Sequence, residues 1–476
     1  MTRANRILRA LACLGGAGIG LAPAFGGVAV GLAAVGAVGF GALLLLNIEG
    51  AFAVLTFASL FEGVPALELA VKAATVVFFV VWLATMGARS AHVRELLGRH
   101  TRLALTILLF VAWITASISW SERPEIDVIL VSWYVAIAIF LMTVTLVTRE
   151  AHLWWISAAI VLGGVLLTIG GLGGTPFAPG LPFVPDAVQE DRLQGGIADP
   201  NFFAALLVAG IVLAGGLMAA HRGVAVRLTL LAAVGILVLG TLATQSRGGL
   251  VALGAAAACA LVVFRRRRLV VLGLMGLAIA VGGPGLAVNP EALERVTTVD
   301  EGGTGRTDIW RVALAVAADH PILGVGIGNF AVHSPRYVDE VGPLERADLI
   351  AEDHLVAHSF YLELLAETGI VGLGLFLVAV GGGLMACWRA IVRLDDMGDA
   401  SLAAMARAVF VAIVAILAAG AFLSGGQDER LWILLALGPA ILGMAVRRGA
   451  PAPAPPLDAY AGYSTTVERS RSLAGV

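Results

Sequence analysis

The sequence has few charged residues. Of its 476 residues only 13% are Asp, Glu, Lys or Arg, whereas 59% are hydrophobic, and the mean hydropathy is +0.93. A soluble protein has about a quarter of its residues charged. So few charges cannot coat a water-soluble globule with this much apolar side chain. The composition therefore excludes a soluble globular protein and indicates a protein of the lipid bilayer.

Cysteine is also scarce. Cys13, Cys259 and Cys387 each lie in an apolar run, which excludes a disulfide framework and a zinc site built on cysteines. Glycine is abundant, with 59 residues, but has no triplet period, which excludes a collagen-like chain. The net charge of −2 indicates no particular partner. We expect neither a cofactor nor a nucleic-acid partner.

Long hydrophobic runs are the main feature that the sequence does have. A membrane-spanning helix needs about 20 apolar residues. We therefore predict an all-α polytopic membrane protein with about twelve transmembrane helices in a single membrane domain, 1–448. If the first run turns at Pro23 and a further span lies at 50–62, the number becomes fourteen. The twelve runs are 10–47, 66–88, 103–120, 128–148, 153–172, 202–220, 228–245, 249–264, 269–287, 366–388, 408–424 and 431–446.

The distribution of arginine predicts the orientation, because positively charged short loops stay cytoplasmic. The basic loops all fall on the side of both termini: 89–102, 221–227, 265–268, 389–393 and 447–448. The other side receives a smaller loop, 173–201, and a large extracytoplasmic loop, 288–365, in which we expect short helices. The Pro- and Ala-rich tail, 449–476, is predicted to be a disordered cytoplasmic end.

Arg247 departs from this distribution, because it lies between two predicted helices on the outer side. Its segment, 244–249, reads Thr-Gln-Ser-Arg-Gly-Gly. One interpretation is an arginine that reaches anionic lipid headgroups. The other is an anion receptor, because the two glycines allow close backbone approach and the next helix begins there with free N–H groups.

A second arginine of this kind, Arg306, lies in the large outer loop. It precedes a predicted helix that runs to about Ala318, with Thr307 or Asp308 near the N-cap. The predicted apolar face carries Ile309, Trp310, Ala313, Leu314 and Ala317, and such an amphipathic helix can lie on the membrane surface. Arg306 would then be placed to bind phosphate oxygens, although a purely structural arginine is the alternative.

The glycine-rich segment 321–330 resembles a dinucleotide-binding fingerprint only superficially, because no strand–helix unit surrounds it. We interpret it as flexible turns.

His358 closes the large outer loop, at the mouth of the next span. Helical spacing predicts that Leu362 and Leu365 share its face. Histidine is the side chain best suited to take a proton at neutral pH, which makes His358 a candidate base. A structural histidine is the alternative, and His333 and His354 in the same loop are competitors. Their spacings match no closed metal site, so no metal is expected.

Arg192 and Asn201 also lie on the outer side, before the span that begins near residue 202. Three arginines from three distant segments and one histidine therefore face one compartment. Guanidinium groups without a metal cluster suit a pyrophosphate. Because nucleotides are not normally available outside the cytoplasmic membrane, the expected ligand is a lipid-linked pyrophosphate.

These residues resemble the bacterial O-antigen ligase and polymerase superfamily. The resemblance covers about 190–370 and rests on four motifs in order, none of which is specific alone. One departure is Ser359, where the family often has Asn. The motifs are Arg192 with Pro200-Asn201; Ser246-Arg247-Gly248-Gly249; Gly305-Arg306 to Trp310, followed by Pro321 and Gly324-x-Gly326-x-Gly328-x-Phe330; and His358, Leu362 and Glu367-x-Gly369.

The resemblance implies a metal-independent, inverting glycosyltransferase of the cytoplasmic (inner) membrane, with its active site facing the periplasm or cell exterior. The donor would be a glycan on a polyprenyl pyrophosphate such as undecaprenyl pyrophosphate. Arg247 and Arg306 would bind the pyrophosphate, and His358 would orient or deprotonate the acceptor hydroxyl. Arg192, Asn201 and Glu367 would complete the substrate-binding site. The acceptor stays open among the lipid A core of lipopolysaccharide, another lipid-linked repeat and a protein.

Two other classes of protein compete with this interpretation. A transporter of a glycan or small anion would place its arginines at mid-membrane on discontinuous helices, whereas these arginines lie at outer loop ends. A non-catalytic assembly protein of the cell envelope would tolerate the loss of His358.

Overall fold

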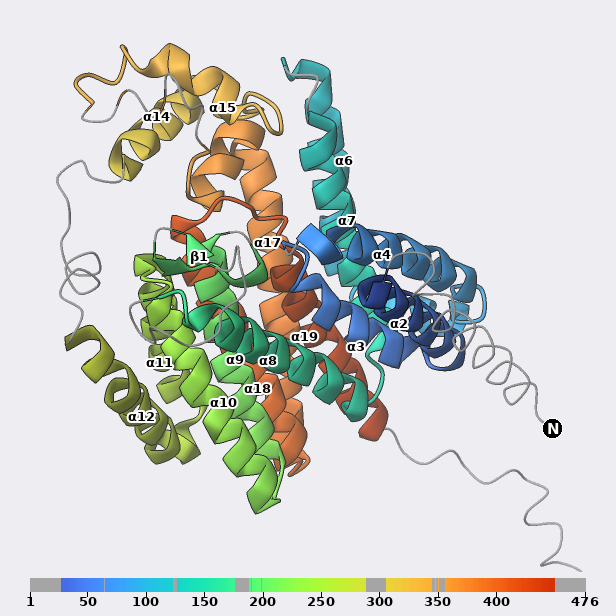
Figure 1. Cartoon of the computed structure of the whole chain (residues 1–476). Coiled ribbons are helices and arrows are strands. Elements are labelled where there is room, and N and C mark those ends of the chain that lie inside the picture. The colour runs from blue at the N-terminus through green and yellow to red at the C-terminus, as the bar shows by residue number, and fades with distance from the viewer. Residues whose placement is uncertain are drawn as a thin grey trace, which may run out of the picture.

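The chain folds into a bundle of helices, and a short two-stranded ribbon is part of the described residues (Figure 1). The computed structural model describes residues 27–63, 65–122, 126–175, 188–189, 191–197, 199–287, 305–344, 347, 350 and 356–449. The α-helices are α2 Gly27–Leu46, α3 Ile48–Ser59, α4 Pro65–Thr85, α5 Ser90–Arg99, α6 Thr101–Ala116, α7 Ile126–Leu146, α8 Glu150–Leu172, α9 Pro200–Ala220, α10 Val224–Ala243, α11 Arg247–Val263, α12 Arg268–Ala287, α14 Arg306–Asp319, α15 Phe330–His333, α17 Phe360–Asp396, α18 Ala400–Ala419 and α19 Glu429–Arg448. The shorter elements are the strands β1 Val188–Gln189 and β2 Arg192–Leu193, and the 3₁₀ helices η1 Ser117–Trp120, η2 Gly195–Ile197, η3 Arg265–Arg267, η4 Ser334–Tyr337 and η5 Gly420–Phe422.

The predicted class, an all-α polytopic membrane protein, is confirmed. Within the described ranges, nine helices are long and apolar enough to cross a membrane, or ten if α11 and α12, bent by 102°, form one broken span. The expected twelve or fourteen spans stay a prediction, because the first run begins among residues 1–26, outside the described part. The extra span expected at 50–62 meets α3, whose 12 residues extend about 18 Å, too short to cross alone.

Helices α9, α18 and α19 form the centre of the bundle and are the most buried of the candidate spans. Small residues allow this close packing: a Cβ atom at Gly216 of α9 would overlap the Cβ of Ala408 in α18. Helices α4, α6 and α10 are far more exposed. Their apolar side chains belong to the hydrophobic band that faces lipid.

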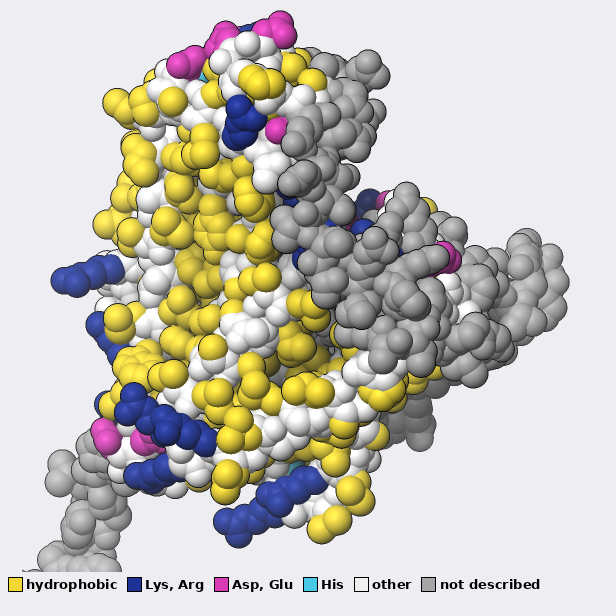
Figure 2. All heavy atoms as spheres, turned by 90° about the vertical axis from the view of Figure 1, so that its left-hand side faces the viewer, with side chains coloured by type: hydrophobic (Ala, Val, Ile, Leu, Met, Phe, Trp, Pro, Cys, Tyr) yellow, Lys and Arg dark blue, Asp and Glu magenta, His cyan; other side chains and the backbone are white. Residues whose placement is uncertain are grey.

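Charges mark the two ends of this band. Figure 2 shows acidic side chains at the end that carries α14 and α15, arginines gathered at the opposite end, and a broad hydrophobic surface between them. The arginines of 265–268, between α11 and α12, are all exposed. We call the end that carries α14 and α15 the outer end; the side of the membrane that it faces stays a prediction. The predicted tail beyond residue 449 lies outside the described residues.

The outer helix α14 packs its apolar face against protein, whereas the sequence had suggested the membrane surface as one place for this face. Its buried residues include Ile309, Val312 and Val316, which join Phe330 and Tyr337 in a second small core. Leu314, expected on the apolar face, is 52% exposed. The side chains of α15, η4 and α17 cover the apolar face in place of lipid.

The glycine-rich turns 321–330 are bonded to a break in α17. Gly369 has φ 65° and interrupts the helix there. The backbone N–H of Gly326 donates to the carbonyl of Glu367 at 2.8 Å, and that of Ile370 donates to the carbonyl of Pro321 at 2.9 Å. These bonds replace helical bonds that the break removes. The segment interpreted as flexible turns therefore holds the outer helices on α17.

Replacing Gly324 by Ala should destabilise this attachment. Gly324 has φ +67°, and an added Cβ would overlap the backbone carbonyl of Glu367. Left-handed strain costs about 1–3 kcal/mol, and the overlap adds to it. We expect a clear fall in the thermal midpoint of the purified protein. Gly374→Ala, in open space on α17, is the matched control and should change little. Equal midpoints for both variants would contradict the described attachment.

Candidate active site

Arg192 and Asn201 form one hydrogen-bonded unit at the outer ends of α9 and α11. Arg192, in β2, donates from Nε to the carbonyl of Thr244 at 3.0 Å and from Nη2 to Asn201 Oδ1 at 3.2 Å. The hydroxyl of Ser246 donates to the same Oδ1 at 2.8 Å. Two segments about 50 residues apart are thereby held together, next to Arg247.

Arg247 is the first residue of α11. Ser246 is the N-cap, and its hydroxyl accepts from the backbone N–H of Gly249 at 3.1 Å. Gly248 and Gly249 are buried. An added Cβ atom would press on Phe422 at Gly248 and on Ala204 at Gly249. The sequence predicted that the two glycines allow close backbone approach. The backbone at these glycines approaches neighbouring side chains of the protein, which fixes the direction in which α11 begins.

Arg306 is the first residue of α14, after Gly305, which is the N-cap with φ 62°. Thr307 and Asp308 follow in the first turn, near the N-cap as expected. Arg306 was expected to precede the helix and is instead its first residue. Burial lowers the pKa of the Arg306 guanidinium, the positive charge of Arg247 lowers it further, and the carboxylate of Asp199 opposes them. Arg306 therefore lies within electrostatic reach of Arg247, although 59 residues separate them.

His358 lies two residues before α17, at its outer mouth, as predicted. Its backbone is left-handed, with φ 47°, so it is outside the helix and the predicted shared face with Leu362 and Leu365 is wrong. The indole N–H of Trp310 fixes its position by donating to the Ala357 carbonyl at 3.1 Å. Burial and then Arg306 lower the pKa of His358, while Asp199 raises it. The net lowering favours the uncharged imidazole at neutral pH.

Four helix N-termini begin in this region: those of α9, α11, α14 and α17. Asn201 and Ser246 join the first two, and the charges of Arg306 and His358 act on each other at the other two. Helix N-termini present unpaired N–H groups and a partial positive charge. Together with Arg247 and Arg306 they form a site suited to a multiply charged anion.

Asp199 is the residue of this cluster that sequence reasoning missed. It is the N-cap of α9, and its Oδ1 accepts from the backbone N–H groups of Asn201 and Phe202 at 2.7 and 2.9 Å. The sequence signal was present, because Asp-Pro before an apolar run is a helix start. That signal predicts a cap only. The action of its charge on Arg306 and His358 depends on the tertiary structure.

Glu367 is placed differently from the other site residues. It is 4% exposed, and its Oε1 accepts from the backbone N–H of Phe330 at 3.2 Å, so it supports the glycine-rich turns. Of the competing histidines, His333 lies in α15 and His354 lies outside the described residues. No group of three or more His, Cys, Asp or Glu within the described ranges is arranged to hold a metal ion.

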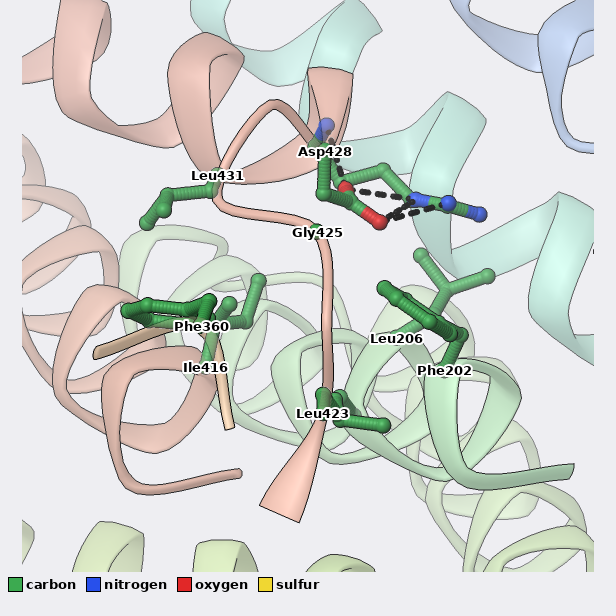
Figure 3. Close-up of a pocket in the computed structure, with 10 residues that line it drawn as sticks. Phe202, Leu206, Phe360, Ile416, Leu423, Gly425, Asp428 and Leu431 are labelled. Atoms are coloured by element: carbon green, nitrogen blue, oxygen red, sulfur yellow. Dashed lines mark hydrogen bonds and ion pairs between the residues drawn. The ribbon is translucent and has the colours of Figure 1, made fainter. Parts of the chain in front are cut away.

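A small cavity adjoins the site on the side of the bundle core (Figure 3). Phe202 and Phe360, from the first turns of α9 and α17, contribute to its apolar wall. On its other side the carboxylate of Asp428 accepts from the guanidinium of Arg430 at 2.6 and 2.8 Å, so these two charged groups are paired with each other. Its volume of about 20 Å³ suits one water molecule. This cavity is too small for a substrate.

Comparison with known proteins points to the region that contains most of these candidate residues. Residues 231–377 match the O-antigen ligase family, and this stretch includes Arg247, Arg306, His358 and Glu367. A search among curated proteins found no match. With its membrane-spanning helices, the match supports a glycan-transferring role in a membrane. The match confirms the resemblance over the three motifs that it spans, which begin at Ser246, Gly305 and His358, whereas the motif of Arg192 and Asn201 lies before it: residues 231–377 are similar to the O-antigen ligase family.

Proposed function

We propose that the protein transfers a glycan from a polyprenyl pyrophosphate to a hydroxyl of an acceptor, with inversion and without a metal ion, on the outer face of the cytoplasmic membrane. The observation that carries the proposal is that Arg306 lies within electrostatic reach of Arg247, Asp199 and His358. The O-antigen ligase match over these segments supports the same chemistry.

The proposed reaction is a direct displacement at the anomeric carbon. The neutral imidazole of His358 takes the proton of the acceptor hydroxyl as its oxygen bonds to that carbon. The bond to the pyrophosphate oxygen breaks on the opposite face, which inverts the configuration. Arg247 and Arg306 stabilise the charge that grows on the departing pyrophosphate. Asp199 stabilises the imidazolium that forms.

The remaining predicted residues have supporting roles in this proposal. Arg192 and Asn201 hold the starts of α9 and α11 at the spacing that the pyrophosphate requires, as their mutual hydrogen bonds suggest. Glu367 has an indirect role: its carboxylate accepts a hydrogen bond from the backbone of the turns 321–330 and so holds these turns in place.

The direct test is transfer by the purified protein, with a lipid-pyrophosphate glycan as donor and with or without a chelator. We expect release of polyprenyl pyrophosphate that a chelator does not reduce. Release of polyprenyl pyrophosphate that requires added metal would contradict the metal-independent mechanism. Movement of intact donor across a vesicle membrane, without release of polyprenyl pyrophosphate, would indicate a transporter. Glycan from a deletion strain identifies the reaction: lost attachment indicates a ligase, and shortened chains indicate a polymerase.

The proposed orientation predicts which cysteine reagents label the protein. Asp339 is exposed in the outer segment and Arg266 is exposed at the opposite end. In a protein whose native cysteines are replaced, Asp339→Cys should react with an impermeant maleimide in intact cells. Arg266→Cys, the matched control, should react only after permeabilisation. The reverse pattern would place the site in the cytoplasm and remove the proposed function.

A further inference from the structure

A second, larger cavity opens near the outer end of α6, away from the arginine site. Its volume is about 640 Å³, and it is lined by Trp120, Glu122, His320, His333 and the turn 321–325; we call it the outer cavity. Asp319, which also lines it, ends the helix that Arg306 begins. A helix of 14 residues is about 20 Å long, so about this distance separates the outer cavity from Arg306.

The walls of the outer cavity are held in place by long-range hydrogen bonds. Asn329 is fully buried, and its Oδ1 accepts from the backbone N–H of Glu122 at 2.9 Å. The backbone N–H of Ile327 donates to the hydroxyl of Ser117 at 3.1 Å. The cavity is therefore formed before any ligand binds, which is typical of small-molecule sites.

Two buried nitrogen atoms of the lining side chains have no hydrogen-bond partner: Trp120 Nε1 and His333 Nε2. His333 is only 8% exposed. The carboxylate of Glu122 lies 3.6 Å from its Nε2, beyond hydrogen-bond length. Buried polar atoms are nearly always paired, and leaving one unpaired is costly. A hydroxyl group can accept a hydrogen bond from the indole N–H and can bond the imidazole nitrogen in either direction.

The charges of the outer cavity disfavour an anion. Glu122 and Asp319 are acidic, and no lysine or arginine is among the described residues that line it. Arg336, nearby, is engaged by Glu122 through bonds of 3.2 and 2.6 Å. Burial lowers the pKa of His333, which favours its neutral imidazole. The arginine site, in contrast, suits phosphate.

Apolar surface completes the outer cavity. The ring of Trp120 packs on Trp113 with centroids 5.9 Å apart, and Ile322 and Leu323 on the turn are 60% and 47% exposed. An uncharged sugar matches this combination, because a sugar ring has an apolar C–H face and a rim of hydroxyl groups. An aromatic face and a few convergent polar groups are what such a ligand requires.

We propose that the outer cavity binds an uncharged sugar unit of the glycan chain, about 20 Å from the reacting carbon, through the Trp120 ring and the nitrogen atoms of Trp120 and His333. The inference rests on the proposed function, because it assigns this sugar to the donor or the acceptor of the same transfer. The site would favour substrates with glycan chains long enough to reach it.

The binding test uses full-length protein in nanodiscs and soluble oligosaccharides of one or several repeats, without lipid or phosphate, from the strain's own surface polysaccharide. We expect Trp120→Phe, which keeps the ring and removes the N–H, to weaken binding roughly 3- to 10-fold. His333→Leu should do the same, and His333→Gln should bind more tightly than His333→Leu. Trp155→Phe, on α8, is the matched control. Unchanged binding by the double variant Trp120→Phe/His333→Leu, or no binding by the wild type, would overturn the proposal.

A transfer assay separates this inference from the proposed function. The double variant should lose the preference for long over short chains, on the donor or on the acceptor, which identifies the chain that binds. Arg306→Lys should lose transfer but keep oligosaccharide binding. Loss of oligosaccharide binding in Arg306→Lys would move the sugar to the arginine site and overturn the inference. Full transfer by Arg306→Lys would instead contradict the proposed function.

Discussion

His358→Ala is expected to lose roughly 10²- to 10⁴-fold in turnover while it still binds the lipid-linked donor. Removal of a general base has an effect of this size. Donor binding should persist, because Arg247 and Arg306 hold the pyrophosphate in the proposed mechanism. Single-turnover transfer and donor binding, measured on the same preparation, separate the two effects.

The other outer histidines provide the controls for this result. His333→Ala and His354→Ala should lose much less turnover than His358→Ala. Normal turnover in His358→Ala would remove the imidazole from the mechanism. A His358→Ala protein that no longer binds donor would make His358 a phosphate ligand or a structural residue.

The pH profile tests the state of the base. Burial and Arg306 hold the pKa of His358 below its ordinary value of 6.5, while Asp199 partly opposes them. The reactive form is the neutral imidazole, so activity should be constant around neutral pH and fall only as the pH drops through this lowered pKa. The residual activity of His358→Ala should lack this acid limb.

Asp199→Asn sharpens the same test. Asparagine still caps α9, so the helix should begin as before. The substitution removes the negative charge that raises the pKa of His358. The acid limb should therefore move to lower pH. Turnover should also fall, because the imidazolium loses its partner. An unmoved acid limb would show that Asp199 acts only as a cap.

Arg247→Lys and Arg306→Lys are each expected to lose about 10²-fold or more in turnover although the positive charge remains. A planar guanidinium can bond two phosphate oxygens at once, whereas an ammonium group is a point charge. Removal of one preorganised donor to a developing charge costs about 10²–10³-fold. The measurement is turnover at saturating donor, with expression and thermal stability recorded for each variant.

Arg311→Lys is the matched control for these variants. Arg311 lies on α14, five residues after Arg306, and donates to the carbonyls of Pro343 and Val341 at 2.9 and 2.7 Å. Turnover of Arg311→Lys should stay close to that of the wild type. Wild-type turnover in both Arg247→Lys and Arg306→Lys would indicate lipid-headgroup anchors in place of pyrophosphate ligands.

Local patterns predicted where several candidate residues lie, because helix starts leave local signals. Ser246-Arg247-Gly248-Gly249 and Gly305-Arg306 each begin a helix, and His358 precedes one. The errors came where tertiary contacts override spacing. His358 is left-handed, so helical spacing did not apply to it, and Leu314 is exposed because α17 and the neighbouring turns cover the other side of α14.

The sequence by itself determined that the protein lies in a lipid bilayer, that it is helical, and which residues are most of the candidates for the site. Hydropathy and arginine placement are local properties, and a bilayer permits few structures that satisfy every backbone group other than helices. Only the tertiary structure decided which residues meet. It joined Asp199 to Arg306 and His358. It bonded the turns 321–330 to the break at Gly369 and enclosed the outer cavity beside Trp120. Such contacts depend on segments far apart along the chain, and no local pattern in either partner specifies the other.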